Sequence, residues 1–268
     1  MIDAHVHIWR LARHDCVWPT PDEGVLYRDF TLEELIAALD EAGIDRAILV
    51  QSQESARDTA WLIETGMTTD CISGVIGWAD LCDRAAVAAL SDQPLLKGVR
   101  PMVQARAADW YDDPALDAGL ETMAEHGLVL DALIRPVHLP ALDRLAARHP
   151  DLVVVIDHAA KPTGGPAGFH AWKTAIAPLA DRPNVHVKLS GLTTEIARDA
   201  VGPVVEAVIA LFGPERLLWG SDWPVVTVSD GYRGWYELAT TLIPAAHHGA
   251  VFGGNAATVY GLQEGGHA

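Results

Sequence analysis

Three histidines and one aspartate stand where their side chains could act together on a small molecule. The chain opens with MIDAHVHIW, in which His5 and His7 are separated by one residue. Side chains two residues apart on a strand point to the same face, so both imidazoles can reach one point. His158 follows the apolar run LVVVID, and Asp222 ends the run LLWGSD. Three imidazoles and one carboxylate make a donor set suited to zinc or a similar divalent ion.

Each of these residues also has an ordinary structural explanation. An isolated H-x-H pair on a strand is more often incidental than functional, and an isolated aspartate at a strand end is usually a turn or cap residue. The combination of His5, His7, His158 and Asp222 favours one shared site. The sequence therefore predicts that the four residues are catalytic, and that the same four are the ligands if a metal is bound.

The elements that would position these residues are eight short apolar runs rich in β-branched residues. Runs such as VVVI lack the alternation of a half-exposed strand, which is typical of strands buried on both faces. The predicted strands cover residues 2–8, 47–52, 74–80, 96–101, 128–134, 152–158, 185–191 and 217–222.

Segments with helical periodicity separate these runs, at 31–43, 114–127, 139–150 and 201–213. The first begins with the capping box of Thr31 and Glu34 and ends at Gly43. Strands that alternate with helices over this length predict an α/β fold, a (β/α)8 barrel of the TIM type, as a single domain covering residues 1–268. A doubly wound open sheet is the alternative, but no G-x-G-x-x-G follows an early strand.

Polar residues gather at the ends of the predicted strands, where barrels of this type place their active sites. Charged groups inside strands need partners. Arg100 is expected either to bind substrate or to pair with Asp131 or Asp80 inside the barrel. Lys188 has a structural and a catalytic interpretation, and the sequence leaves both open.

Composition excludes several kinds of partner. The chain has 268 residues, half of them apolar, and a formal net charge of −17. Such a surface repels phosphates, so we expect no nucleic-acid partner. With no long apolar run and no basic segment before an apolar one, we expect neither a membrane partner nor a signal peptide. Three cysteines without a C-x-x-C pattern predict reduced thiols and a cytoplasmic location. The oligomeric state is not indicated.

Three motifs taken together resemble a known family. The stretches IDAHVHIW, DHAAKP and WGSDWPV, with GVR at 98–100 between them, are similar to the amidohydrolase-related family of barrel hydrolases. Within that family they look most like the sugar-lactone lactonase branch, which includes L-fuconolactonase-like and L-rhamnonolactonase-like enzymes. The resemblance extends from Ile2 to about Tyr260, and it implies a carboxylic ester hydrolase that opens a lactone to a hydroxy acid.

The chemistry of lactone hydrolysis suggests roles for the four residues. Asp222 is predicted to be the general base that takes a proton from the attacking water. Close packing by Trp219, Trp223 and Pro224 is expected to raise the pKa of its carboxyl group. His5, His7 and His158 are expected to polarise the carbonyl, either directly or through one bound ion.

The expected substrate is an uncharged aldono-1,4- or 1,5-lactone, a small molecule covered in hydroxyl groups. It needs hydrogen-bonding side chains around it and aromatic faces for its C–H surfaces. The predicted substrate-binding residues are Arg100, Gln51, Lys161 and His138 for the first purpose, and Trp9, Trp78 and Trp223 for the second.

The metal and the reaction class each keep an alternative. Binuclear members of the wider superfamily bridge two ions with a carboxylated lysine or a glutamate, but the middle strands here carry Arg100 and Asp131. The resemblance therefore implies at most one divalent ion, zinc above all, or metal-independent hydrolysis with the histidines as hydrogen-bond donors. The alternative functions are a metal-dependent decarboxylase or amide hydrolase on a related barrel, and a binding protein without catalysis.

Overall fold

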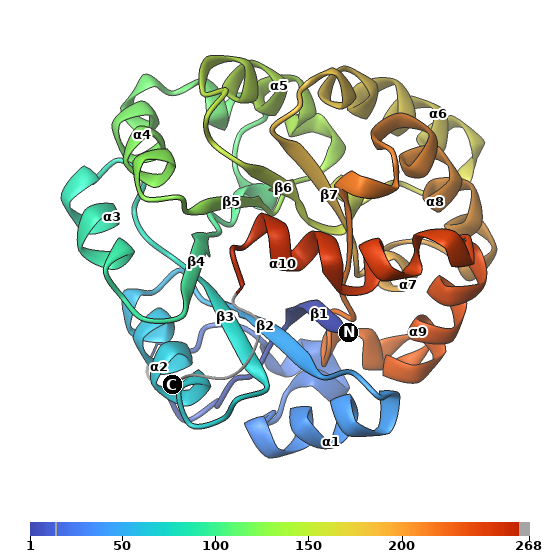
Figure 1. The fold of residues 1–268 in the computed structure, drawn as a ribbon, viewed down its shortest axis with the longest axis horizontal. Coiled ribbons are helices and arrows are strands. Elements are labelled where there is room, and N and C mark those ends of the chain that lie inside the picture. The colour runs from blue at the N-terminus through green and yellow to red at the C-terminus, as the bar shows by residue number, and fades with distance from the viewer. Residues whose placement is uncertain (14, 263–268) are drawn as a thin grey trace.

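The computed structural model describes residues 1–13 and 15–262, and its centre is one sheet of eight parallel strands. The strands follow one another around the sheet in chain order, with helices outside them (Figure 1). They are β1 Ile2–Val6, β2 Arg46–Val50, β3 Ile72–Gly77, β4 Leu96–Val99, β5 Val129–Ala132, β6 Val154–Ile156, β7 Val185–Leu189 and β8 Leu217–Trp219. This arrangement confirms the (β/α)8 prediction and excludes the doubly wound sheet.

Main-chain hydrogen bonds between β1 and the segment after β8 bring the two ends of the sheet together. The N–H of Asp222 donates to the carbonyl oxygen of His5 at 2.9 Å, and the N–H of His7 donates to that of Trp223 at 2.7 Å. The first and last strands therefore meet at the residues that the sequence singled out.

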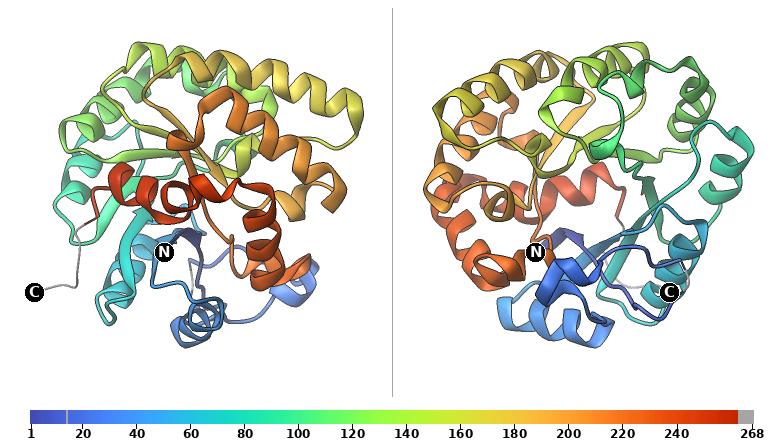
Figure 2. Two further views of the ribbon diagram at one scale, coloured as in Figure 1. Left: turned by 45° about the vertical axis from the view of Figure 1, so that its right-hand side comes forward. Right: turned by 180° about the vertical axis from the view of Figure 1, so that it is seen from behind.

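Helices surround the strands on every side, as the two further views show (Figure 2). The α-helices are α1 Leu32–Ala42, α2 Ala56–Gly66, α3 Arg84–Ser91, α4 Asp117–Glu125, α5 Leu139–Arg148, α6 Gly165–Ile176, α7 Leu192–Glu195, α8 Arg198–Phe212, α9 Gly231–Leu242 and α10 Asn255–Val259. The capping box at α1 is confirmed, since the Thr31 side chain accepts from the Glu34 N–H and the Glu34 side chain accepts from the Thr31 N–H. Gly43 ends that helix in the left-handed conformation at φ 68°.

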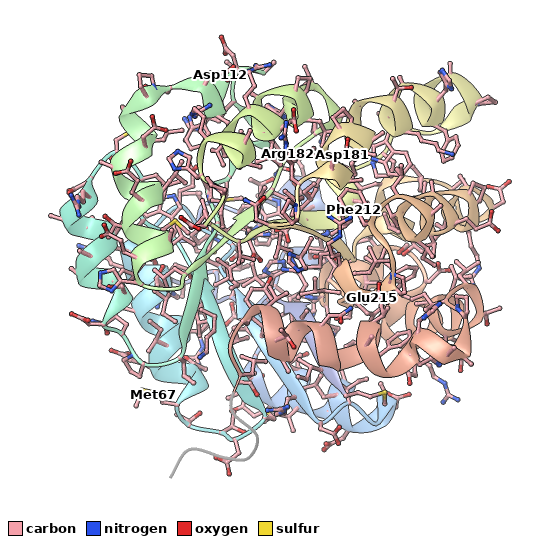
Figure 3. The ribbon with its side chains drawn as sticks, turned by 45° about the horizontal axis from the view of Figure 1, so that its top comes forward. Met67, Asp112, Asp181, Arg182, Phe212 and Glu215 are labelled. Carbon is pink, nitrogen blue, oxygen red and sulfur yellow. The ribbon has the colours of Figure 1, made fainter. Side chains whose placement is uncertain are left out.

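Two apolar clusters fill the molecule, one on each side of the strands. The outer cluster lies between strands and helices and includes Leu49 and Val187. The inner cluster includes Ile48 and Leu218 from the strands and Ala256 from α10. Side chains fill the interior (Figure 3), and α10 crosses the middle of the barrel (Figure 1). The short C-terminal helix thus covers the barrel at the end where the strands begin.

A bulge in β1 turns its two histidines toward the interior. Ile2 and Ala4 belong to the inner cluster, but Val6 belongs to the outer one. Between Asp3 and Val6 the pairing with β2 shifts by one residue. One extra residue in a strand lets two consecutive side chains leave on the same side. His5 and His7 therefore face the barrel interior, although a regular strand would have sent them outward.

No helix in the described part of the chain is long and apolar enough to cross a membrane. The three cysteines are free thiols, which agrees with the sequence prediction.

Candidate active site

His5, His7 and Asp222 converge where β1 meets the segment after β8. Nε2 of His5 and Nε2 of His7 are 3.2 Å apart. Oδ1 of Asp222 lies 3.6 Å from the first nitrogen and 3.3 Å from the second. The ring of His158 lies beside that of His5, with 4.7 Å between the ring centroids. The four predicted catalytic side chains are thus neighbours, and each is at least 96% buried because none exceeds 4% exposure.

Contacts of the ring nitrogens indicate the tautomers of His5 and His7. Nδ1 of His7 lies 2.8 Å from the carbonyl oxygen of Val50. A carbonyl oxygen only accepts, so Nδ1 of His7 carries a proton, and in the neutral ring the lone pair is on Nε2. A guanidinium nitrogen of Arg100 lies 3.4 Å from Nε2 of His5. Since guanidinium only donates, Nε2 of His5 also presents a lone pair.

Nε2 of His5, Nε2 of His7 and Oδ1 of Asp222 therefore face one another with their lone pairs. A cation bound between them would remove the repulsion among these three atoms. Burial lowers the pKa of His5 well below its ordinary value, so that ring is neutral. Ligands placed 2.0–2.2 Å from a tetrahedral zinc ion lie roughly 3.3–3.6 Å apart. The separations of 3.2, 3.3 and 3.6 Å match this geometry. The residues fit one divalent ion held by His5, His7 and Asp222.

Asp222 has an unusual backbone conformation and a low pKa. Its φ is 61°, in the left-handed region that a non-glycine residue rarely adopts. Burial by itself raises the pKa of the carboxyl group, but the nearby His158, His7 and His5 outweigh burial and lower the pKa below its ordinary value. The expectation of a raised pKa is wrong, because it considered burial without the imidazoles that accompany it.

Trp219 does not enclose this carboxylate. Its ring packs on the outer side of the sheet, 5.4 Å from that of Tyr236 and 5.5 Å from that of Phe252. The reason is the alternation of β8, where the inward side chain is that of Leu218.

His158 lies on a turn of left-handed backbone directly after β6. Its φ is 53°, and the next three residues also have positive φ. Nδ1 of His158 is 2.9 Å from the hydroxyl oxygen of Ser190. A Cβ atom at Gly191 would come within 2.6 Å of this nitrogen and 2.8 Å of Oδ2 of Asp222. Glycine at 191 thus allows His158 and Asp222 to approach the same stretch of backbone.

A second group of potential ligands consists of His5, Asp157 and His158. Here the carboxylate of Asp157 already has cationic neighbours, since one oxygen lies 3.1 Å from Nζ of Lys188 and the other 3.3 Å from Arg100. A second ion at this place would add positive charge beside two existing cations. The group made by His5, His7 and Asp222 therefore fits a cation better.

The partner expected for Arg100 is corrected by this geometry. Arg100 pairs with Asp157, not with Asp131 or Asp80, while Asp131 pairs with Lys188 at 2.6 Å. Arg100 directly follows β4 and Asp157 directly follows β6, so the two side chains meet across the barrel although 57 positions separate them in the sequence.

Four of the seven predicted substrate-binding residues follow strands at the same end of the barrel as the histidines. Arg100 contacts His5 directly, and its guanidinium also donates to the main-chain oxygen of Gln51. The Gln51 side chain is fully buried and donates to the main-chain oxygen of Arg100 at 2.7 Å. Lys161 is half-buried and forms an ion pair with Glu195 at 2.6 Å. Trp78, after β3, is also half-buried.

The remaining three are deeply packed. Trp9 is 1% exposed, and its Nε1 donates to the main-chain oxygen of Arg28 at 2.7 Å. Trp223 is 6% exposed. His138 is 1% exposed, and its Nε2 lies 3.2 Å from the main-chain oxygen of Arg106. Their role in binding a substrate stays a prediction.

Sequence reasoning missed two acidic residues near the site. Asp3 accepts hydrogen bonds from the N–H groups of His5 at 3.0 Å and Ser221 at 2.9 Å, and so ties β1 to the segment before Asp222. The signal was a lone acid inside an apolar strand. Glu195 ends the short helix α7 and shows no sequence signal that separates it from a surface residue.

Comparison with known proteins shows what the chain is similar to. Residues 2–262 match the family model described as Amidohydrolase. An L-fucono-1,5-lactonase of Burkholderia ambifaria is 40% identical, with 97% of this chain and 94% of the relative covered. An L-fucono-1,5-lactonase of Burkholderia multivorans is 31% identical, with 98% and 96% covered. A crystal structure of an amidohydrolase from Burkholderia multivorans with bound zinc superposes with a TM-score of 0.92 at 31% identity, over 98% of this chain and 99% of the other.

Proposed function

The chain belongs to the amidohydrolase family, and on this premise we propose that it opens a sugar-derived lactone to the hydroxy acid. Relatives named as lactonases cover almost its whole length, so its class is that of the carboxylic ester hydrolases. The observation that carries the proposal is the convergence of two imidazole nitrogens and one carboxylate oxygen within 3.6 Å of one another. The substrate class we favour is an aldono-1,5-lactone of a deoxy sugar, the kind of compound named for these relatives.

Asp222 acts as the general base in this proposal. The low pKa keeps its carboxylate ionised at neutral pH, so a proton acceptor is always available. Its two oxygens face different ways, because Oδ1 lies 3.3 Å from His7 whereas Oδ2 borders Gly191. We assign Oδ1 to the ligand group that it forms with Nε2 of His5 and Nε2 of His7, and we assign Oδ2 to proton transfer. One residue then serves both purposes without giving up its basic oxygen.

The reaction needs one water and one proton transfer in each direction. The water oxygen bonds to the carbonyl carbon while its proton moves to Oδ2 of Asp222. The bond between the carbonyl carbon and the ring oxygen then breaks. The departing ring oxygen takes the proton back, and the product is a hydroxy acid. Atoms and charge balance without another reactant.

His5 and His7, with Oδ1 of Asp222, would hold one divalent ion, zinc above all. When bound, such an ion polarises the carbonyl and stabilises the developing oxyanion. The alternative of metal-independent hydrolysis needs the histidines as donors. Their Nε2 atoms are acceptors in this structure, so the geometry supports the metal-bound form, in which the ion would take the lone pair of His5 that faces Arg100 here. Arg100, a buried donor 3.4 Å from Nε2 of His5, is proposed to assist the oxyanion.

Substrate hydroxyl groups would meet the half-buried side chains at the same end of the barrel. Lys161 and Glu195 present a donor and an acceptor side by side, 2.6 Å apart. Trp78 offers a partly exposed ring for the apolar face of a sugar. The decarboxylase and amide-hydrolase alternatives are not favoured, because both full-length curated relatives described above are lactonases.

A screen of aldono-1,4- and 1,5-lactones with a pH-indicator readout tests the proposal. Each lactone is measured with zinc-loaded protein, with chelator-treated protein, and with buffer alone to subtract spontaneous hydrolysis. We expect acid release with at least one 1,5-lactone to rise in proportion to enzyme concentration. Rates equal to buffer across the whole panel, from protein shown to contain zinc, would contradict the proposal.

A further inference from the structure

Buried polar contacts run through the barrel from its base to the active site. Tyr260, the residue after α10, donates to Asp131 at 2.9 Å. Nζ of Lys188 lies 2.6 Å from Asp131 and 3.1 Å from Oδ1 of Asp157. That oxygen lies in turn 3.4 Å from Nδ1 of His5. The charged members of this chain of contacts are fully buried. The active site therefore rests on an ionic layer inside an otherwise apolar barrel.

The layer is balanced in charge. Two carboxylates, Asp131 and Asp157, face two cations, Lys188 and Arg100. Lys188 contacts Oδ1 of Asp157 at 3.1 Å and Arg100 contacts Oδ2 at 3.3 Å, so each oxygen of this side chain faces a cation. Asp157 is therefore a carboxylate with two acceptor oxygens. Neither Asp131, Lys188 nor Tyr260 has a part in the proposed reaction.

The contacts on both sides of the His5 ring indicate that its proton is on Nδ1. On one side, Arg100 can only donate, so Nε2 of His5 must accept. On the other side, Oδ1 of Asp157 lies 3.4 Å from Nδ1, and a carboxylate can only accept. The neutral ring therefore carries its proton on Nδ1. A flipped tautomer would place a lone pair against the carboxylate and an N–H against the guanidinium.

We infer that Asp157 is a positioning residue that holds His5 with its proton on Nδ1 and its Nε2 lone pair toward His7 and Asp222. Lys188 and Arg100 orient Asp157 for this purpose, because each contacts one of its oxygens. Carboxylates that fix the tautomer of a metal-binding histidine typically contribute 10–100-fold to metal affinity or activity. The effect on catalysis rests on the proposed function, whereas the tautomer is a property of the free protein.

The test uses protein labelled with ¹⁵N in histidine and freed of metal by chelator. Two-bond ¹H–¹⁵N correlation spectra distinguish the two tautomers, and His5→Gln assigns the signal. We expect the Nδ1–H form in the wild type and its loss in Asp157→Ala. Asp157→Asn keeps an oxygen that can accept from Nδ1, so we expect it to retain the tautomer. Zinc affinity and kcat should fall about 10–100-fold in Asp157→Ala, with KM nearly unchanged because Asp157 does not touch substrate.

Asp131→Asn is the matched control, since Asp131 belongs to the same buried layer but does not contact His5. We expect it to lower the midpoint of urea unfolding and to leave the His5 signal unchanged. Retention of the Nδ1–H signal in Asp157→Ala, or an equal change in Asp131→Asn, would overturn the positioning role. Should the wild type turn over no lactone while Asp157→Ala loses the tautomer, only the proposed function fails.

Discussion

Asp222 combines a strained backbone, a low pKa and two oxygens with different surroundings. We predict that Asp222→Asn lowers kcat by roughly 10²–10⁴, the loss typical of a removed general base. Asparagine tolerates the left-handed conformation better than most residues, so the variant should fold. Steady-state kinetics on the lactone identified in the screen gives kcat, and circular dichroism checks the fold. A kcat within tenfold of the wild type would mean that another group takes the proton.

Residue types could be predicted at this scale, but their partners could not. The stretches around His5, His7 and Asp222 carry a recognisable set of metal-binding side chains, so the three residues could be assigned to one site from the sequence. Asp157 precedes His158 in the same motif, yet nothing in the sequence shows that it faces His5 across the barrel. The direction of the Asp222 pKa shift failed for the same reason. It depends on imidazoles from two other strands, not on neighbours in the chain.

Elements could be predicted where each carries its own local signal. The eight apolar runs correspond to the eight strands, and Thr31 and Glu34 mark the start of α1 as expected. The bulge in β1 has no such signal, because it appears only in the pairing of Asp3 and Val6 with β2. Without the bulge, the alternation of apolar residues alone would have sent His5 outward. The proposed metal site therefore depends on a feature of strand pairing.

The start of α2 supplies a prediction on stability. Asp58 lies in the first turn of this helix and accepts from the N–H of Ser52, just beyond β2. Burial raises its pKa from the ordinary value of 3.8 to about 6. A raised pKa means that the folded state binds the proton more tightly than the unfolded state. The contribution to stability is therefore present below pH 4 and is lost as pH rises through about 6.

We predict that Asp58→Asn makes the protein less sensitive to pH in this window. One pKa unit corresponds to about 1.4 kcal/mol, so the difference between the proteins should change by roughly 2–3 kcal/mol between pH 4 and pH 7.5, in favour of the variant at the higher pH. Urea unfolding at both pH values measures it. Comparison with the wild type cancels groups that titrate in both proteins. If the unfolding free energies of the two proteins change with pH in parallel, burial does not raise the pKa of Asp58.

The whole barrel could be predicted because its units repeat. Strands buried on both faces, each followed by a helix, leave few folds at this length. The main-chain hydrogen bonds that join His5 to Asp222 and His7 to Trp223 could not be predicted from the sequence, because these residues lie near its two ends. Neither was the role of α10, a helix of five residues whose Ala256 packs into the inner cluster. Both features depend on contacts that form only when the sheet closes into a barrel.

One bound ion would join the first and last strands of this barrel, since His5 lies in β1 and His7 directly follows it, whereas Asp222 follows β8. A ligand that binds only the folded state stabilises it by about 2.7 kcal/mol at a hundredfold excess over its Kd. Each kcal/mol raises Tm by about 2–4 °C in a domain of 150–250 residues, so we predict a rise of roughly 5–10 °C when zinc is added to chelator-treated protein. Calorimetry measures Tm, and elemental analysis of the zinc-loaded wild type should find one zinc per chain. The double variant His5→Gln, His7→Gln removes two of the three ligands, so it should show no rise, and its own unfolding transition checks that it folds. A Tm that zinc leaves unchanged in the wild type, or an equal rise in the double variant, would move the metal away from this site and leave His5, His7 and Asp222 to act without it.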